Sequence, residues 1–395
     1  MMKDERHNAI TDVPGIRVGH AQNDEALTGV TVVLCTKGAV AGMEQRGGAS
    51  GTRQTDALRS MHLVQKAHAI VLSGGSAFGL DAASGVVKWL EERGIGFETR
   101  AAKVPIVPAA ILYDLAIGRS DVRPDAAMGY AACEAASEGP VAEGNVGAGC
   151  GATVGKIYGI SRAMKAGLGT ASMDLGDGLT IGAMVAVNAF GDVIEPSTGQ
   201  IIAGARNIDA EASLSRALAQ GDGKHRLYGD APHLADTLAV MKSLVGKATL
   251  RFAAEPLENT IIGIVATNAD MNKEEINQVA QMAHDGVARA IRPAHTLFDG
   301  DTLFALATGG VKADVNTVGA YAAEVVARAI VRAVLNAQPA GGLPANASFR
   351  SLPTSSILVR EKRAEDAEPL LALARTLPAW FTSTGVESEL ALDLR

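Results

Sequence analysis

Cysteine, aromatic residues and basic tracts are all scarce in this chain of 395 residues, and each shortage excludes a class of protein. The three cysteines, Cys35, Cys133 and Cys150, are odd in number and far apart, which is typical of a reducing, cytoplasmic compartment rather than a disulfide scaffold. The net charge is −7, and no basic tract is interleaved with aromatic residues. We therefore expect no nucleic acid among the partners of this protein.

Metal-binding and membrane-spanning patterns are missing as well. The chain has no CxxC or HExxH motif and its 8 histidines are scattered, so we expect neither a metal nor a cofactor. No uncharged apolar run reaches about 18 residues, and Met1–Asn8 has no apolar core, so we expect neither a membrane span nor a signal peptide. With 47% hydrophobic and 20% charged residues, the chain can form a large core.

Glycine, by contrast, is abundant at 44 residues, and many of the glycines gather in loops. Loop 45–53 holds two arginines and two hydroxyl residues, and it suits either a polar pocket or a plain surface turn. In 73–80 a strand, a glycine turn and a helix follow one another, an order that can present N–H groups to an anion or oxyanion. Loop 144–156 predicts closely packed backbones with Lys156 at the edge of a site. None of these loops fully matches the GxSxG, GxGxxG or P-loop pattern.

Hydrophobic periodicity predicts strands and helices along most of the chain. Buried strands are expected at 29–34, 69–72, 179–188, 260–268 and 303–307. Helices are expected at 56–66, 80–93, 272–291 (opened by a capping box) and 315–336.

Composition divides the chain further. The charged stretch 207–258 indicates a linker with a surface helix around 231–245, and the composition changes again from Pro339, with a further helix around 364–376. We therefore expect a single catalytic domain, 1–338, and a C-terminal extension, 339–395.

Some polar residues near the ends of apolar segments allow two interpretations. Asn188 closes a long apolar strand, where its amide can either donate to a developing oxyanion or cap a turn. Tyr113 can line a pocket or simply pack on the core with its hydroxyl satisfied. By pattern alone, Asp299-Gly300 indicates a hairpin turn.

The junction Asn259-Thr260 joins a polar, helix-like region to a continuous apolar run. We hypothesise that the chain cuts itself there, so that Thr260 becomes a new N-terminus and a nucleophile. Its α-amine would then serve as the base, since that group has a pKa near 7.7–8.0 and needs no histidine. The alternative is a plain loop-to-strand junction.

A set of segments, in this order and spacing, carries a resemblance that favours the first reading. They are Ile10–His20, Thr28–Val32, Arg46–Gly48, Ser73–Leu80, Asn259–Thr260, Ala266–Asn268 and Asp299–Ala305. Through them, residues 8–337 resemble the DmpA-type aminopeptidases, a group that includes L-aminopeptidase/D-esterases, β-peptidyl aminopeptidases, nylon-oligomer hydrolases and a pantetheine hydrolase.

The resemblance implies an α/β fold, an αββα sandwich of the DmpA/ornithine acetyltransferase type that is N-terminal-nucleophile hydrolase-like and is self-cleaved between residues 259 and 260. Thr260 matches the nucleophile, which is Ser or Thr among members. Asp299 and Asp301 match acids that orient the amine or hydroxyl of the nucleophile, and Asn188 matches the amide of the oxyanion hole.

The remaining matched residues belong to the pocket. Tyr113 and Lys156 match residues that assist catalysis or processing in the nylon-hydrolase branch. The matched glycine loops imply a substrate pocket that comprises Arg46, Gly47, Gly48, Ser73, Gly74, Gly75 and Ser76. One departure is Gln54, which stands where many relatives carry an acid and so bears on recognition of a substrate ammonium group.

From this resemblance we expect a self-processing aminopeptidase or amidohydrolase that releases N-terminal residues from small peptides, amides or esters through a Thr acyl-enzyme. An alternative substrate is a non-peptide amide, such as a pantetheine-like compound or an ω-amino-acid oligomer. Two further alternatives are an ornithine-type acetyltransferase and a small-molecule binder that never cuts itself. The family likeness also implies a homo-oligomer, a tetramer or larger.

Overall fold

The computed structural model of the chain describes residues 6–207, 234–243 and 259–349. Most of the predicted linker and the predicted helix around 364–376 lie outside the described residues. The strands are β1 (Arg17–Asn23), β2 (Thr28–Gln45), β3 (Thr52–Arg53), β4 (Lys66–Ser73), β5 (Phe97–Glu98), β6 (Lys103–Val104), β7 (Ala109–Ile111), β8 (Thr153–Val154), β9 (Met164–Lys165), β10 (Leu168–Asp174), β11 (Thr180–Asn188), β12 (Asp192–Ile194), β13 (Ile201–Ala203), β14 (Thr260–Ala269), β15 (Ile291–Arg292) and β16 (Thr302–Val311). The α-helices are α1 (Ala82–Glu92), α2 (Ala126–Glu134), α4 (Thr237–Lys242), α6 (Lys273–Ala290) and α7 (Val315–Leu335). The 3₁₀-helices are η1 (Ile10–Asp12), η2 (Thr55–Leu58), η3 (Ser76–Asp81), η4 (Gly147–Gly149), η5 (Ile160–Arg162) and η6 (Asn346–Ser348).

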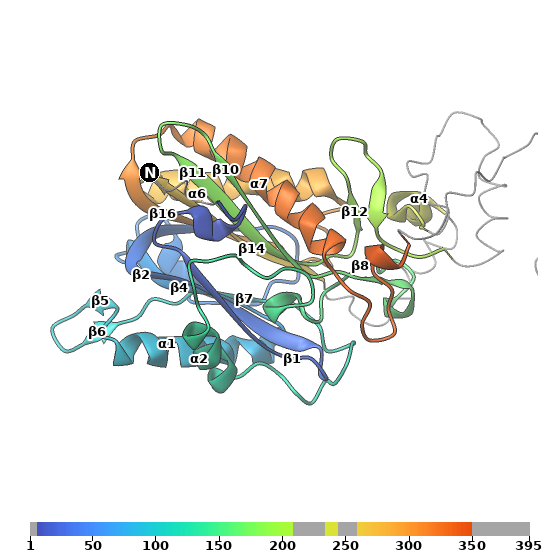
Figure 1. Ribbon diagram of the computed structural model, residues 1–395, viewed down its shortest axis with the longest axis horizontal. Helices are drawn as coiled ribbons and strands as arrows, with labels where there is room; N and C mark the ends of the chain where they lie inside the picture. Colours follow the sequence, from blue (N-terminus) through green and yellow to red (C-terminus); the bar gives the residue numbers. More distant parts are fainter. Residues whose placement is uncertain (1–5, 208–233, 244–258, 350–395) are drawn as a thin grey trace, which may run out of the picture. The chain divides into compact units, whose positions relative to one another are not determined.

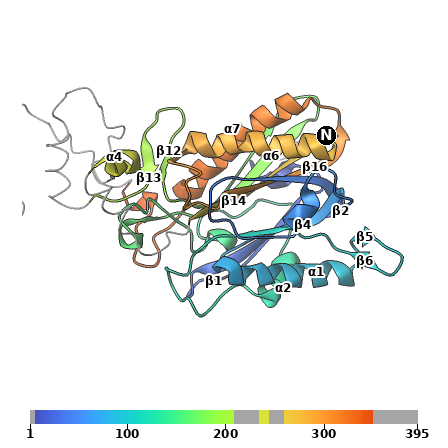
Figure 2. The ribbon, with the colours of Figure 1, turned by 180° about the vertical axis from the view of Figure 1, so that it is seen from behind.

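These elements form the expected αββα sandwich. The main sheet has the order β10-β11-β14-β16-β2-β4-β7-β3, with β1 also paired to β2. Strand β2 spans 18 residues and links the two β layers, because its first half pairs with β1 and β4 and its last part with β16. Helices α6 and α7 cover one outer face and α1 and α2 the other, as Figure 1 shows and Figure 2 confirms from behind.

Three hydrophobic clusters fill the spaces between the four layers. The first cluster includes Val279 of α6 and Ile330 of α7. The second, between the β layers, includes Ile70 and Phe304, and the third includes Val71 of β4 and Trp89 of α1. The strand β14 is buried along its whole length, since alternate residues belong to two of these clusters. A strand that is buried on both faces reads as a continuous apolar run, which is why the sequence pattern predicts it correctly.

The register of three strands brings polar residues to one end of the sheet. Strand β11 pairs with β14 in antiparallel fashion and places Asn188 opposite Thr260. Strand β16 runs parallel to β14, beginning with Thr302 opposite Ile262, and α6 provides the long crossover that a parallel pair requires. The segment just before β16, which contains Asp301, therefore lies beside the first residues of β14.

The helix predicted over 56–66 is wrong. Only the 3₁₀-helix η2 forms there, and the backbone then turns through Met61 at φ 67°. The ammonium of Lys273, at the start of α6, donates to the carbonyl oxygens of Ala57, His62 and Val64 at 2.9, 3.1 and 2.7 Å. Carbonyls that converge on one lysine cannot point along a helix axis, so this tertiary contact overrides the local helical pattern.

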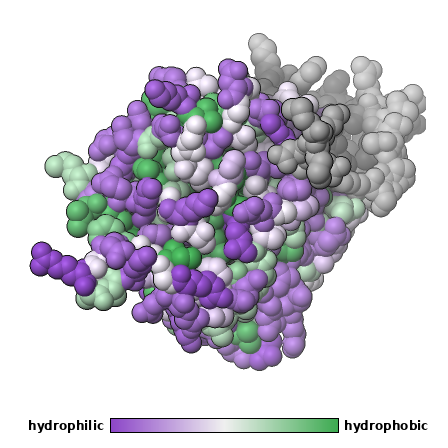
Figure 3. Space-filling view, turned by 60° about the vertical axis from the view of Figure 1, so that its left-hand side comes forward, coloured by the Kyte–Doolittle hydropathy of each residue, from purple (hydrophilic) through white to green (hydrophobic). Residues whose placement is uncertain are grey.

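The helices predicted around α6 and α7 are confirmed. Asn272 accepts a hydrogen bond from Glu275 N at 2.9 Å and Glu275 accepts one from Asn272 N at 2.9 Å, which completes the predicted capping box. Within the described ranges, no helix combines the length and the apolar composition that crossing a membrane requires. The face in Figure 3 is mainly hydrophilic, with apolar side chains in small separate patches.

Residues 339–349, the described part of the predicted extension, lie against the same body as the preceding chain. Lys165 N donates to Pro344 O at 2.8 Å, and the Asn346 amide donates to Ile202 O at 2.7 Å. The division at residue 338 stays a prediction.

Candidate active site

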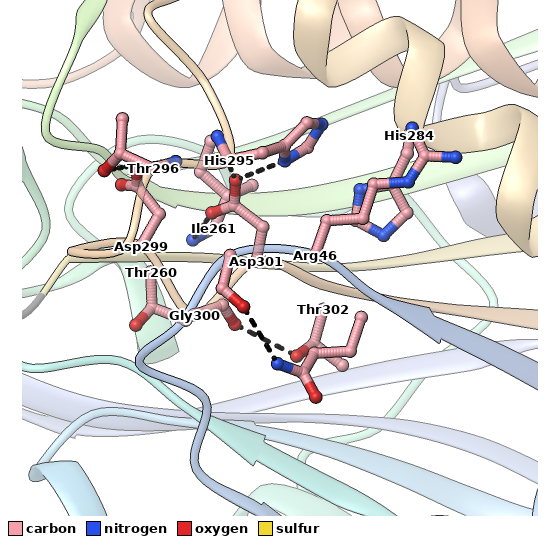
Figure 4. Close-up of polar contacts among 12 residues, drawn as sticks. Arg46, Thr260, Ile261, His284, His295, Thr296, Asp299, Gly300, Asp301 and Thr302 are labelled. Atoms are coloured by element: carbon pink, nitrogen blue, oxygen red, sulfur yellow. Dashed lines mark hydrogen bonds and ion pairs between the residues drawn. The ribbon is translucent and has the colours of Figure 1, made fainter.

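The candidate site forms where the start of β14, the end of β11 and the loop before β16 meet. Asn188 stands opposite Thr260 in the ladder, and Asn259 forms a parallel bridge with Asp299. Figure 4 shows Thr260, Asp299, Gly300 and Asp301 gathered at this point. The structure thus brings together residues that lie far apart in the sequence.

The peptide bond between Asn259 and Thr260 is buried, with the two residues 0% and 2% exposed. The Thr260 hydroxyl donates to the carbonyl oxygen of Asn259 at 2.5 Å, and Gly300 N donates to the same oxygen at 2.8 Å. Asn259 N donates to Phe298 O at 2.9 Å, which holds the peptide in place from the other side. A buried hydroxyl therefore lies against a carbonyl that a backbone N–H already polarises.

Asp301 reaches β14 through the residue that follows Thr260. One carboxylate oxygen accepts from Ile261 N at 2.9 Å. The other accepts from both the backbone N and the ring Nδ1 of His295, at 3.2 and 2.7 Å. This carboxylate is fully buried and ties the loop before β16 to the first residues of β14.

Asp299 is held by a different set of donors. Thr296 donates its backbone N and its hydroxyl to one carboxylate oxygen at 3.0 and 2.6 Å, and Phe190 N donates to the other at 3.2 Å. Burial raises the pKa of Asp299 to about 6, the charge of Asp301 adds to this rise, and the hydrogen bonds from Thr296 and Phe190 oppose it. The pattern reading of Asp299-Gly300 as a hairpin turn is wrong, because β16 runs parallel to β14 after it.

Asn188 is the centre of a second polar group. Lys156 Nζ donates to the side-chain and main-chain oxygens of Asn188 at 2.8 and 3.1 Å, and Thr153 donates its backbone N and hydroxyl to the side-chain oxygen at 3.1 and 3.2 Å. The Asn188 amide donates to Tyr113 O at 2.9 Å. Burial lowers the pKa of Lys156 to about 7, although the charge of Asp299 acts in the opposite direction. Lys156 is thus buried beside Asn188.

The loop 73–76 is held through Asp114, the neighbour of Tyr113. Gly75 N donates to the Asp114 carboxylate at 2.7 Å, as does the Thr28 hydroxyl. Gly74 N and Ser76 N donate to the carbonyls of residues 29 and 112 at 2.9 and 3.0 Å. These N–H groups are engaged inside the protein, so this loop does not offer them to an anion.

The loop 46–49 braces the acidic segment through its backbone. Arg46 N donates to Asp301 O at 2.9 Å and Ala49 N donates to Asp299 O at 3.1 Å. The guanidinium of Arg46 turns elsewhere, donating to Gln281 O at 3.2 Å. Loop 46–49 therefore holds the acidic segment through its backbone. The substrate-pocket role expected of Arg46, Gly47 and Gly48 stays a prediction.

His295, Thr296 and Thr153 are not among the site residues that the sequence predicts, although all three form hydrogen bonds with predicted site residues. His295 and Thr296 lie in the polar stretch just before Asp299, and that closeness is the signal that could have marked them. Thr153 stands beside Lys156 in the glycine-rich loop, where a hydroxyl residue gives no distinctive pattern.

One cleft lies apart from this site. A cleft of about 750 Å³ is lined by residues that include Lys66, Asp270 and Gly309. Asp270 follows the end of β14, roughly 30 Å along the strand from Thr260, so the cleft belongs to the other end of the sheet.

Among the residues that the structure describes, no three His, Cys, Asp or Glu side chains gather in a way that could hold a metal ion.

Comparisons with known proteins identify the family of the chain. A family model described as peptidase family S58 matches residues 8–347. An uncharacterized aminopeptidase of Mycobacterium tuberculosis is 42% identical over 360 residues, which cover 85% of this chain and 96% of the relative. A 6-aminohexanoate-oligomer endohydrolase of a Kocuria species is 33% identical over 335 residues, covering 82% of this chain and 84% of that protein.

Two solved structures share the fold. A β-aminopeptidase of a Burkholderia species aligns with a TM-score of 0.61 and 22% identity, covering 87% of this chain and 92% of that one. The L-aminopeptidase D-Ala-esterase/amidase of Ochrobactrum anthropi, described as a variant of the Ntn hydrolase fold, aligns with a TM-score of 0.61 and 21% identity, covering 86% and 88%.

Proposed function

The chain belongs to peptidase family S58 and is an N-terminal-nucleophile-type hydrolase of peptide or amide bonds, and we propose that Thr260 becomes its nucleophile when the chain cuts itself after Asn259. The observation that carries this proposal is the Thr260 hydroxyl lying 2.5 Å from the carbonyl oxygen of its own preceding residue. The Gly300 N–H, 2.8 Å from the same oxygen, supports it further.

Self-cleavage follows from these contacts. The Thr260 oxygen attacks the Asn259 carbonyl carbon, and the charge that develops on the carbonyl oxygen is held by the Gly300 N–H. The C–N bond then breaks, the released nitrogen takes up the hydroxyl proton, and an ester joins the two pieces. Water hydrolyses the ester and leaves a carboxylate on Asn259 and a free amine on Thr260.

Turnover uses the same residue in its new form. The α-amine of Thr260, with a reference pKa near 7.7–8.0, accepts the hydroxyl proton as the oxygen attacks the substrate carbonyl. Asn188 stands opposite Thr260, and its amide is positioned by Lys156 and Tyr113 to serve the oxyanion. Asp299 and Asp301 hold the surrounding backbone. Water then hydrolyses the acyl-enzyme. The substrate is a small peptide, amide or ester whose N-terminal residue becomes the acyl group and is released.

Intact mass of the purified chain tests the proposal. We expect two pieces, 1–259 and 260–395. The Thr260→Ala variant should stay whole and inactive, since it lacks the hydroxyl, while Thr260→Ser should still cut and hydrolyse. A whole wild-type chain with full amidase activity would contradict the proposal.

A second candidate substrate is a non-peptide amide, such as an ω-amino-acid oligomer or a pantetheine-like compound. Its support is the 33% identity to a 6-aminohexanoate-oligomer endohydrolase, together with the Tyr113 and Lys156 pair beside Asn188. Gln54, which replaces a frequent acid, accepts a hydrogen bond from Val107 N at 2.9 Å. Rates on amino-acid p-nitroanilides, β-peptides, pantetheine and aminohexanoate oligomers separate the two candidates.

We place the enzyme in the cytoplasm and in a homo-oligomer. The three cysteines are buried free thiols, which suits a reducing compartment. The oligomer rests on the family resemblance, and light scattering of the processed protein tests it.

A further inference from the structure

His295 makes two hydrogen bonds to the carboxylate of Asp301, close to the candidate nucleophile. Its ring Nδ1 and its own backbone N donate to the same oxygen of Asp301, at 2.7 and 3.2 Å. The backbone of His295 makes these two contacts in a left-handed conformation, with φ 58°. Few residues other than glycine adopt this left-handed conformation, and His and Asn are among those that tolerate it best.

Because His295 holds one oxygen of Asp301, the direction in which the second oxygen points is fixed as well. That oxygen accepts from Ile261 N at 2.9 Å, immediately after Thr260. Figure 4 shows the order of contacts, with the His295 ring above Asp301 and Ile261 on its other side. The carboxylate is fully buried and the histidine side chain is 17% exposed, so water competes little for either bond.

The described neighbours of His295 offer its ring no other hydrogen-bond partner that would set a different orientation. The ring of His284 meets it edge-on, with centroids 5.0 Å apart. His284 Nε2 faces the carbonyl oxygen of Glu44 at 3.0 Å and so carries the hydrogen, while burial lowers the pKa of His284 to about 3 and keeps that ring neutral. The Nε2 of His295 is buried and has no hydrogen-bond partner among the described residues. Asp301 is therefore the group that sets the ring of His295.

We propose that His295 is a positioning residue for the hydrolase: it locks Asp301 so that the carboxylate holds Ile261 N–H and thereby fixes the placement of Thr260. This rests on the proposed role of Thr260 as nucleophile. The nucleophile has to stand in register with Asn188 and Gly300 both before and after self-cleavage. A loose Asp301 would let the first residues of β14 shift, and small displacements of reacting groups cost large factors in rate.

Two substitutions of His295 distinguish a side chain that positions Asp301 from one that only fills space. His295→Gly accepts the left-handed backbone without strain but removes the side-chain donor. His295→Asn also tolerates this backbone and keeps an N–H donor that can reach Asp301. His62→Asn is the matched control, because the His62 side chain is exposed and the hydrogen bonds of this residue to Arg59, Gln65 and Lys273 use its backbone N and carbonyl oxygen.

The expected result is a loss in kcat with little change in KM. His295→Gly should slow self-cleavage and lower kcat about 10–100-fold, with KM within about twofold of wild type. His295→Asn should recover kcat to within about fivefold of wild type, and His62→Asn should match wild type. Free imidazole added to His295→Gly should restore part of the rate, since it can fill the space left by the ring.

Hydrogen exchange at the Ile261 amide gives a readout that needs no activity. Exchange should be faster in His295→Gly than in wild type and near normal in His295→Asn. If His295→Gly cuts and hydrolyses like wild type, or if Asn is as impaired as Gly with normal Ile261 exchange, the inference is overturned. If His295→Gly does not fold, the His295→Asn variant decides, since it should keep both Ile261 protection and kcat.

The two proposals fail in different ways. Wild-type protein that neither cuts nor hydrolyses any amide would overturn the role of Thr260 as nucleophile. In that case unchanged Ile261 exchange in His295→Gly would also overturn the positioning of β14 by His295, and faster exchange would support it.

Discussion

Gly47 lies so close to Asp299 that a Cβ on Gly47 would stand 2.1 Å from the Asp299 carbonyl oxygen. The backbone of Gly47 is also left-handed, with φ +90°. The glycine-rich loop and the acidic segment therefore touch backbone to backbone, and this contact shapes the wall behind Thr260.

Gly47→Ala should displace Asp299 and impair processing. An alanine at positive φ costs about 1–2 kcal/mol of stability in any setting, and the clash should add about 1–3 kcal/mol. Gly15→Ala is the matched control, since Gly15 has φ +85° and a Cβ added there would meet no atom within 4 Å. Urea unfolding and the fraction of cut chain should be measured for both. Equal losses in the two variants would contradict the contact.

Asn188→Asp should leave the protein folded but lower kcat. The new carboxylate can pair with Lys156, 2.8 Å from the present oxygen, yet it cannot donate to Tyr113 O or to an oxyanion. We expect a loss of about 10²–10³ in kcat. Initial rates on a p-nitroanilide substrate, with the melting temperature as a check on folding, measure it. A variant that keeps wild-type kcat would rule out the amide of Asn188 as an oxyanion donor.

Lys156→Met should change the pH dependence of stability. In the folded wild type, burial holds the pKa of Lys156 at about 7, whereas the unfolded chain keeps its ordinary, higher value. Between these values the unfolded state binds more protons, so the wild type gains stability relative to the variant as pH rises. Unfolding at pH 6.5 and pH 9 should reveal this gain. A wild-type advantage that shrinks with rising pH would contradict it.

Asp114→Asn should change the pH dependence of stability in the opposite direction. Burial raises the pKa of Asp114 to about 6, against hydrogen bonds from Thr28 and Gly75 that lower it. The folded state therefore binds more protons than the unfolded state between about pH 4 and pH 6, and wild-type stability falls relative to the variant as pH rises through this window. Denaturation of both proteins at pH 4.5 and 7 tests the sign, because other carboxylates cancel in the difference.

Part of the site is visible in local patterns. The apolar runs that become β11 and β14 end or begin at Asn188 and Thr260, and a reader of the sequence can place both residues at strand ends. The capping box at Asn272 likewise marks the start of α6. The roles of Asp299 and Asp301, however, come from the family resemblance, since their own pattern indicates only a turn.

Local sequence patterns are enough to predict the strands buried on both faces, the capped helices and the junction at Asn259-Thr260, because each depends on neighbours within a few residues. The pairing of donors with acceptors follows from the three-dimensional fold. It turned 56–66 from a helix into a loop around Lys273, engaged the N–H groups of Gly75 and its neighbours inside the fold, and set His295 against Asp301. These outcomes depend on hydrogen-bonding groups that must find partners when buried, and those partners are brought close by strand register and not by chain distance.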